Sequence, residues 1–294
     1  MTPPAPIREL RDLTRARTAI TRERGREVQR LEKLLEDAGI KLSSVASDIV
    51  GVSGRAMLEA LIDGQRDPAV LADLAKRRLR VKIPELTEAL TGRFTSHHAF
   101  LARVRLGLID QHTAAVDRLT GRIEETIEPF RGFRDLICSI PGISTGNADV
   151  IVAEIARTCP GSPPQGTWPH GLVRLPAATS RPGRSSRPRP GRATPYLQGA
   201  LDAAAMSCGQ HPTSYLGAKY WRSCHPTRTT EGQRRRPAML VAIWNMGTNG
   251  AFYDDLGSDY YTRLNPERAR SRAVYVDIPA RSVPAKWMTP AYGS

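Results

Sequence analysis

The stretch SHHAFLARVRLGLIDQHTAAVDRLTGRIEETI, residues 96–127, decides the fold class of this chain. Its apolar residues recur at intervals of three, four or seven, with Arg and Glu between them. They are Leu101, Val104, Leu108, Ala115, Leu119, Ile123 and Ile127. The spacing predicts one long, coiled-coil-like helix over 96–130. A heptad seam leaves two partners open: another helix of the same chain in an antiparallel hairpin, or a second copy in a homo-oligomer.

The residues before this seam also show helical spacing. Between Ile7 and Ala38 apolar residues recur at near-helical intervals, and Gly39 follows as a stop. A shorter helix is expected to begin at Ser53, as N-cap, and to end near Gly64.

A further helix is expected after Pro68, with one strongly basic face. The cluster KRRLRVK, residues 76–82, supplies that face, and Pro84 is expected to end or bend the helix. The whole region 1–95 is therefore predicted to be helical.

Downstream of the seam, the segment LICSIPGISTGNADVIVAEI, residues 136–155, matches a helix-hairpin-helix. In such a unit the turn glycines let backbone N–H groups at the start of the second helix approach a phosphate, and the helix dipole adds to the attraction. A helical turn with a purely structural role is the alternative. The residues predicted to contact a DNA backbone are Pro141, Gly142, Ile143, Ser144 and Gly146.

Beyond this segment helical periodicity is interrupted. Residues 156–194 and 223–237 are rich in Pro, Arg, Gly and Ser, so both are expected to be irregular. An Ala-rich helix is expected from Pro195, and an apolar one over 238–247. We therefore expect a mainly α protein, with a helical carboxyl-terminal domain over 131–274 and a disordered tail over 275–294.

Charge is divided unevenly along the 294 residues, which carry a formal net charge of +14. Residues 1–155 hold 24 Lys and Arg against 22 Asp and Glu, whereas residues 156–294 hold 19 against 7. A polyanion is the expected partner of such a basic chain. No apolar run approaches the roughly 18 residues of a membrane helix, and the four cysteines are too sparse for a disulfide framework. A cytoplasmic protein without a membrane partner is expected.

The basic run from Arg174 to Arg192 leaves three interpretations open. It could be an arm that lies along a nucleic-acid backbone and gains affinity by counterion release. It could also be a linker, or a stretch whose coding frame was lost. We favour the last, because out-of-frame translation of GC-rich DNA yields this Pro, Arg, Gly, Ser and Ala composition.

The sequence predicts no metal site. Cys208 and His211, followed by the adjacent Cys224 and His225, lack the spacing that directs four ligands to one tetrahedral metal. A second candidate, the acidic trio Asp254, Asp255 and Asp259, lies among aromatic residues. Helix capping and surface packing are the favoured roles for these three carboxylates, and a magnesium site is the alternative.

Three segments resemble a family, the insertion-sequence transposases of the IS one-ten, IS one-sixteen and IS nine-zero-two types. The first begins PPAPIRELRDLTRARTAITRERGREVQRLEKLLEDAGIKL at Pro3, and the second is residues 136–155. The third combines YLQGALDAAAMSC, residues 196–208, with LVAIWNMGTNGAFYDDLGSDYYTRLNPERARSRAV, residues 240–274.

The resemblance implies DNA recombination and transposition of a mobile element. Family members resemble one another in having a resolvase-like domain with four acidic residues for magnesium, a coiled coil, and a domain that supplies a serine nucleophile. Some also use an element-encoded guide RNA. Paired carboxylates and a serine suit this chemistry, because a metal at the scissile phosphate assists attack by a hydroxyl.

This chain departs from the family pattern at its catalytic positions. The resemblance places all four acids before the segment that starts at Pro3, so we expect residues 1–95 to be the helical part that follows a missing catalytic domain. Ser180 lies nearest to the expected nucleophile, but its setting TSRPGR lacks the Ser-Ala-Gly motif. No cofactor is expected in this chain, although magnesium is implied for the intact family.

We therefore expect a DNA transposase by descent, inactive on its own. The alternative is a non-catalytic fragment that binds nucleic acid or dimerises. Irregular segments flanked by good matches favour shifts of reading frame, which translation of the coding DNA for residues 156–194 in the other two frames would test.

Overall fold

In the computed structural model, residues 5–155, 194–223 and 232–264 are described, and all regular elements among them are helices. The expectation of a mainly α protein is thus confirmed. The chain forms two compact units, divided after Phe130. Among the described residues, unit 1 holds 5–130 and 153–155, and unit 2 holds 131–152, 194–223 and 232–264. None of the described helices is long and apolar enough to cross a membrane.

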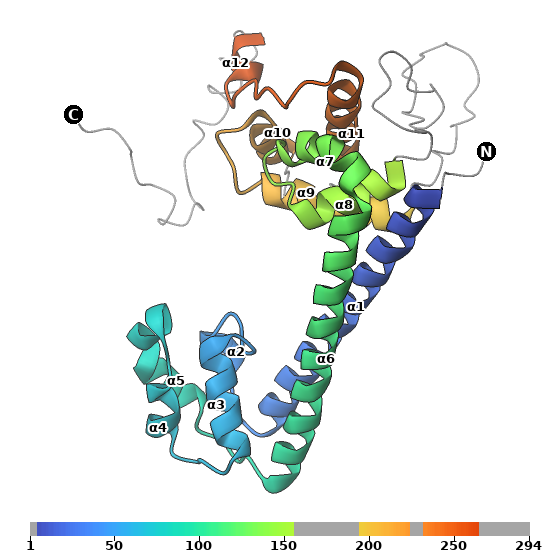
Figure 1. Cartoon of the computed structure of the whole chain (residues 1–294). Coiled ribbons are helices and arrows are strands. Elements are labelled where there is room, and N and C mark those ends of the chain that lie inside the picture. Colours follow the sequence, from blue (N-terminus) through green and yellow to red (C-terminus); the bar gives the residue numbers. More distant parts are fainter. Residues whose placement is uncertain (1–4, 156–193, 224–231, 265–294) are drawn as a thin grey trace, which may run out of the picture. The chain divides into compact units, whose positions relative to one another are not determined.

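Unit 1 is built on two long helices, α1 (Ala5–Asp37) and α6 (Ser96–Thr126), which lie side by side (Figure 1). They are antiparallel, because Arg24 bonds Thr113 whereas Asp37, farther along α1, meets His98 near the start of α6. The long helix expected over 96–130 thus packs within its own chain.

The predicted seam of α6 is confirmed at its carboxyl end, where Ile123 and Ile127 are fully buried, but not along the rest of the helix. Leu101, Leu108, Ala115 and Leu119 are only half-buried and Val104 is 45% exposed. The buried residues are Ala102, Leu106, Ile109, Ile123 and Ile127, and the half-buried Thr113, Val116 and Thr120 continue their alternation of four and three. Two threonines can lie in this seam because each hydroxyl donates to the carbonyl four residues earlier.

The middle of the hairpin is polar. On α1 the buried residues include Thr14 and Glu27, and no apolar residue between Leu10 and Leu31 is fully buried. Glu27 accepts a hydrogen bond from Arg105 of α6 (2.8 Å) and another from Arg30. Burial raises the pKa of Glu27, but these two hydrogen bonds outweigh it and leave the pKa below its ordinary value of 4.5.

A small helical subdomain packs against one end of the hairpin (Figure 1). Its elements are α2 (Leu42–Val45), α3 (Val52–Ile62), α4 (Pro68–Asp73), the 3₁₀ helix η1 (Arg77–Lys82) and α5 (Ile83–Ala89). Their apolar faces form one cluster with the adjoining turns of α1 and α6, in which Leu35, Leu58 and Leu86 are fully buried.

Two boundaries in this subdomain differ from the sequence-based expectations. Gly51, not Ser53, is the N-cap of α3, and the Ser53 hydroxyl accepts the Lys76 N–H (2.9 Å). Pro84 lies in the first turn of α5 and does not end the preceding helix, because a first-turn proline lacks only an N–H that the helix does not use.

Unit 2 begins with α7 (Arg131–Cys138), which follows the 3₁₀ helix η2 (Glu128–Phe130) of unit 1. The next helix, α8 (Thr145–Ile155), starts in unit 2, and its last three residues belong to unit 1. The other helices of unit 2 are α9 (Pro195–Cys208), α10 (Tyr215–Ser223), α11 (Gly232–Asn249) and α12 (Tyr260–Leu264). Its buried residues include Leu201, Ala204, Met239 and Ile243 on α9 and α11.

The expected irregular segment 223–237 is helical in its last part. Helix α11 begins at Gly232, before the expected helix over 238–247. The reason is that Gln and Arg, which fill positions 233–236, are good helix formers. The tail 275–294 and most of the segment 156–194 lie outside the described residues.

Candidate nucleic-acid interface

Residues 139–144 join α7 to α8 in the turn that the sequence singles out. The Ile143 N–H donates to the Ile140 carbonyl (3.1 Å), and both side chains are buried. Gly142 has a φ of +88°, a left-handed conformation that glycine adopts without strain. The order helix, turn, helix is therefore present, while phosphate binding by this turn stays a prediction.

The structure gives Gly142 a packing role. A Cβ atom at this position would lie 2.6 Å from the backbone nitrogen of Cys208, at the end of α9. The Cys208 thiol donates to the Pro141 carbonyl, so the turn and α9 are in direct contact. The close approach of α9 is therefore sufficient to require glycine here.

The start of α8 is the accessible part of this unit. Ser144 is exposed, its carbonyl accepts the Ala148 N–H (2.9 Å), and its hydroxyl accepts the Asn147 N–H (3.4 Å). Pro141, Gly142 and Gly146 are half-buried. An anion at this turn would therefore meet Ser144 and the positive end of α8, and not the buried side chain of Ile143.

A buried ion pair connects the two helices that flank the turn. Arg134 of α7 and Asp149 of α8 approach to 3.6 Å, and their side chains are 8% and 1% exposed. Removal of one partner would leave a charge in a poorly solvated place, which is costly. Substitution of either partner alone is therefore expected to disturb the arrangement that presents Ser144.

Several residues for which the sequence suggests a role lie outside the part of the chain that the structure describes. Ser180 and the basic run from Arg174 to Arg192 lie outside the described residues, as do Cys224 and His225. Their roles stay predictions from sequence.

Two carboxylates of the acidic trio in unit 2, Asp255 and Asp259, make defined contacts. Asp255 accepts the N–H of Tyr215, the first residue of α10, at 2.7 Å and the Gly257 N–H at 3.1 Å. Asp259 pairs with Arg263 one turn later. Asp255 thus caps a helix, as expected, whereas Asp259 forms an ion pair on the surface of α12. Within the described ranges no three His, Cys, Asp or Glu side chains gather as metal ligands.

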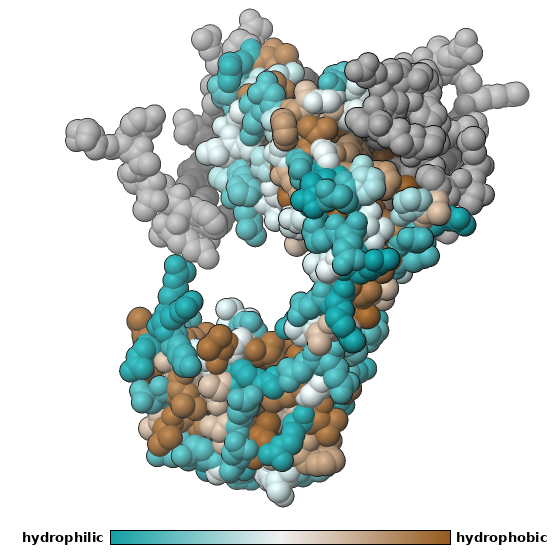
Figure 2. Space-filling model, viewed as in Figure 1, coloured by the Kyte–Doolittle hydropathy of each residue, from teal (hydrophilic) through white to brown (hydrophobic). Residues whose placement is uncertain are grey.

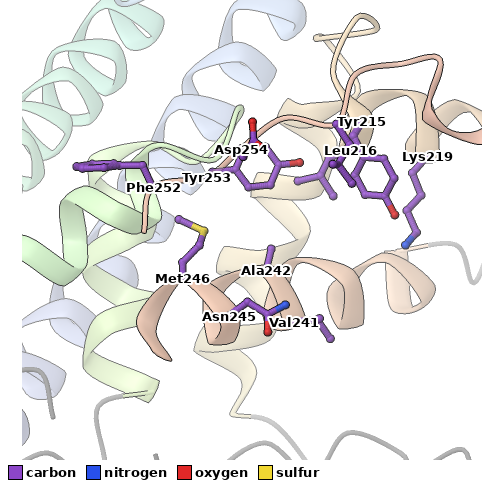
Figure 3. Close-up of a pocket in the computed structure, with 11 residues that line it drawn as sticks. Tyr215, Leu216, Lys219, Val241, Ala242, Asn245, Met246, Phe252, Tyr253 and Asp254 are labelled. Atoms are coloured by element: carbon purple, nitrogen blue, oxygen red, sulfur yellow. The ribbon is translucent and has the colours of Figure 1, made fainter. Parts of the chain in front are cut away.

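A cavity of about 540 Å³ lies between α10, α11 and the segment after α11 (Figure 3). Lys219 and Tyr215 stand at one end, with the ammonium group 5.6 Å from the centre of the ring. Burial and the charge of Asp255 raise the pKa of Tyr253 at the wall. The lining is mostly apolar and has one cation and one carboxylate, Lys219 and Asp254, so it has no marked charge preference.

A second cavity, of about 530 Å³, lies in unit 1 between the residues that lead into α3 and the segment 76–82. Lys76, Arg77, Arg78 and Lys82 line it, opposite a single carboxylate, Asp48. We call it the basic cleft. The sequence shows the basic run but not its location, because residues 45–53, which form the other wall, have no charge pattern of their own.

The comparisons with known proteins add no relative to this picture. A scan against protein-family models, a search of curated proteins and a search of solved structures each find no match for this chain.

Proposed function

We propose that this chain is a DNA-binding protein of the insertion-sequence transposase type named above. The resemblance of its three segments to that family is the reason for the class. The α7–turn–α8 unit carries the proposal of DNA contact, because it exposes Ser144 at the positive end of an 11-residue helix. A helix start of this kind binds anions, and the phosphates of a DNA backbone are the anions that the family resemblance implies.

The test adds one negative charge at this helix end. Ser144→Asp keeps an N-cap side chain, so the helix is retained, but the carboxylate repels a phosphate. We expect about tenfold weaker binding to a duplex from the element ends, with thermal stability unchanged. Thr95→Asp is the matched control, because Thr95 is the exposed N-cap of α6 in unit 1. Equal affinities of the two variants would refute this interface.

Catalysis needs a separate test. The TSRPGR setting of Ser180 lacks the family motif, so we expect no strand transfer from this polypeptide alone in the presence of magnesium. Activity would refute the inactive interpretation, and DNA binding without activity would favour the non-catalytic alternative. Addition of the element's guide RNA in the same assay tests that partner.

Self-association is the remaining part of the proposal. The seam of α6 faces α1 of the same chain, so a homo-oligomer has to use another surface. Phe100 and Val104, one turn apart on α6, are 67% and 45% exposed. Sedimentation of the wild type and of Phe100→Ser/Val104→Ser should show a dimer that the variant weakens, and a monomeric wild type would remove this part.

A further inference from the structure

The basic cleft gathers several basic side chains in one concavity. Many basic side chains elsewhere in unit 1 contact carboxylates, as in the pairs Arg55–Asp110, Arg105–Glu27, Arg103–Asp63 and Arg122–Glu125. Others, such as Lys33 and Arg93, have no ion pair among the described residues, but they do not line this cavity.

Within the cleft this pairing is missing. No described residue forms an ion pair with Lys76, Arg77 or Arg78, and the Lys82 ammonium contacts only the Val45 carbonyl (3.4 Å). Asp48, the one carboxylate of the lining, accepts the Val50 N–H (3.1 Å) from its own loop. Like charges gathered in one concavity repel each other, and a bound anion removes that repulsion.

Backbone groups add to the positive potential of the cleft. Val52 and Ser53, the first residues of α3, are part of the lining, and the N-cap Gly51 has no side chain that could accept their N–H groups. The Ser53 hydroxyl is occupied by the Lys76 N–H and thereby ties the basic segment to the helix end. Cations on one wall thus face the start of an 11-residue helix on the other. Asp48, whose Oδ2 would lie 2.8 Å from a Cβ atom at Gly51, offsets part of the positive potential of that helix end.

The basic segment also has an unusual backbone. Arg77 has a φ of +53°, and no other non-glycine residue among those described has a positive φ. A left-handed arginine costs about 1 kcal/mol relative to the usual conformations. The hydrogen bond from the neighbouring Lys76 N–H to Ser53 of α3 helps to hold this conformation of the cleft lining.

We propose that the basic cleft binds a phosphodiester group of a nucleic-acid backbone, as a contact region of unit 1 additional to the α7–turn–α8 unit. This inference rests on the proposed function for the kind of polymer. Two guanidinium groups and two ammonium groups match the oxygens of phosphates, and the volume admits a sugar together with its phosphate. Val52, which is 72% exposed in the lining, offers an apolar surface to that sugar.

Figure 2 shows hydrophilic side chains projecting from the part of unit 1 where Figure 1 places α4 and α5, with apolar surface beside them. A backbone-binding region needs this mixture, because phosphates contact cations while sugars contact apolar groups. Contacts to phosphates carry no sequence information directly, so we expect little sequence preference.

The test compares two double variants that remove the same charges. Lys76→Gln/Arg77→Asn alters the cleft, and Asn tolerates the left-handed backbone at position 77. Lys33→Gln/Arg93→Asn removes one exposed lysine and one exposed arginine elsewhere in unit 1. Affinities for a 20-base-pair DNA duplex, a single-stranded RNA and poly-glutamate are measured by fluorescence anisotropy between 50 and 200 mM salt, and circular dichroism verifies folding.

We expect the cleft variant to bind the duplex or the RNA about tenfold more weakly at 50 mM salt. Its plot of log affinity against log salt should be shallower by about one for each lost phosphate contact. The control should match the wild type, and whichever nucleic acid shows the larger loss is the source of the phosphate.

Three results overturn the inference. If the wild type binds nucleic acid and the two double variants bind it equally, the cleft is not a contact region, while the proposed function stands. If the cleft variant loses only poly-glutamate binding, the partner is an acidic protein. If the wild type binds neither nucleic acid, the proposed function fails and the inference falls with it.

Discussion

At the scale of single residues, the sequence and the structure both single out Gly142, but they give it different roles. The sequence assigns it to phosphate approach, whereas the structure places the backbone of Cys208 where a side chain would lie. We expect Gly142→Ala to destabilise unit 2 by about 2–4 kcal/mol, from the left-handed φ and the steric overlap together. Chemical denaturation monitored by circular dichroism measures this.

Gly132 is the matched control for that substitution. It lies in the first turn of α7, and no heavy atom lies within 4 Å of the position of an added Cβ. Gly132→Ala should change stability by less than about 1 kcal/mol, in the stabilising direction. Similar losses for both variants would mean that α9 does not approach the turn.

Cys208 gives a prediction about pH. Burial raises the pKa of its thiol to about 11, from an ordinary value of 9.0. The folded state therefore holds the proton more tightly, so its stability is unaffected below pH 9 and falls as pH rises toward 11. Iodoacetamide labelling followed by mass spectrometry should find Cys208 unreactive at pH 8 in the folded protein and reactive in denaturant. Rapid labelling of the folded protein at pH 8 would contradict the burial.

At the scale of elements, the hairpin of α1 and α6 has two apolar ends and a polar middle. Where Arg24 bonds Thr113 (2.8 Å), hydrogen bonds and ion pairs replace the buried leucines. Local opening is easier where fewer apolar contacts have to be broken. We expect backbone amides of residues 113–120 to exchange with deuterium faster than those of residues 102–109, as measured by hydrogen exchange at single-residue resolution.

A double substitution distinguishes this cause from ordinary helix fraying. Arg24→Leu/Thr113→Leu adds apolar contacts at the middle and should slow exchange there by about tenfold. The single substitution Thr113→Leu leaves Arg24 without its acceptor and should slow exchange less. If both variants exchange as the wild type does, the polar seam is not what limits stability.

Most helix positions were predictable to within a few residues, although α11 begins at Gly232 and not at residue 238, and the buried face of α6 was predicted only at its carboxyl end. Apolar spacing defines α1, α6 and α9 because an amphipathic helix needs one buried stripe. The rest of the buried face of α6 was missed because its apolar residues occupy two adjacent faces, and only the partner helix selects between them. The same reason explains the basic cleft: Lys76 and Arg77 are visible in the sequence, but the helix end opposite them depends on the packing of α3.

At the scale of the whole molecule, the division into two units predicts two unfolding transitions. Leu58 is fully buried in unit 1, and Leu201 is 1% exposed in unit 2. Truncation of a buried leucine to alanine costs about 2–5 kcal/mol, through lost transfer energy and the cavity left behind. In scanning calorimetry of the full chain, Leu58→Ala should lower one transition temperature and Leu201→Ala the other. A shift of both transitions by either variant would show that the chain unfolds as one cooperative unit and would contradict this prediction.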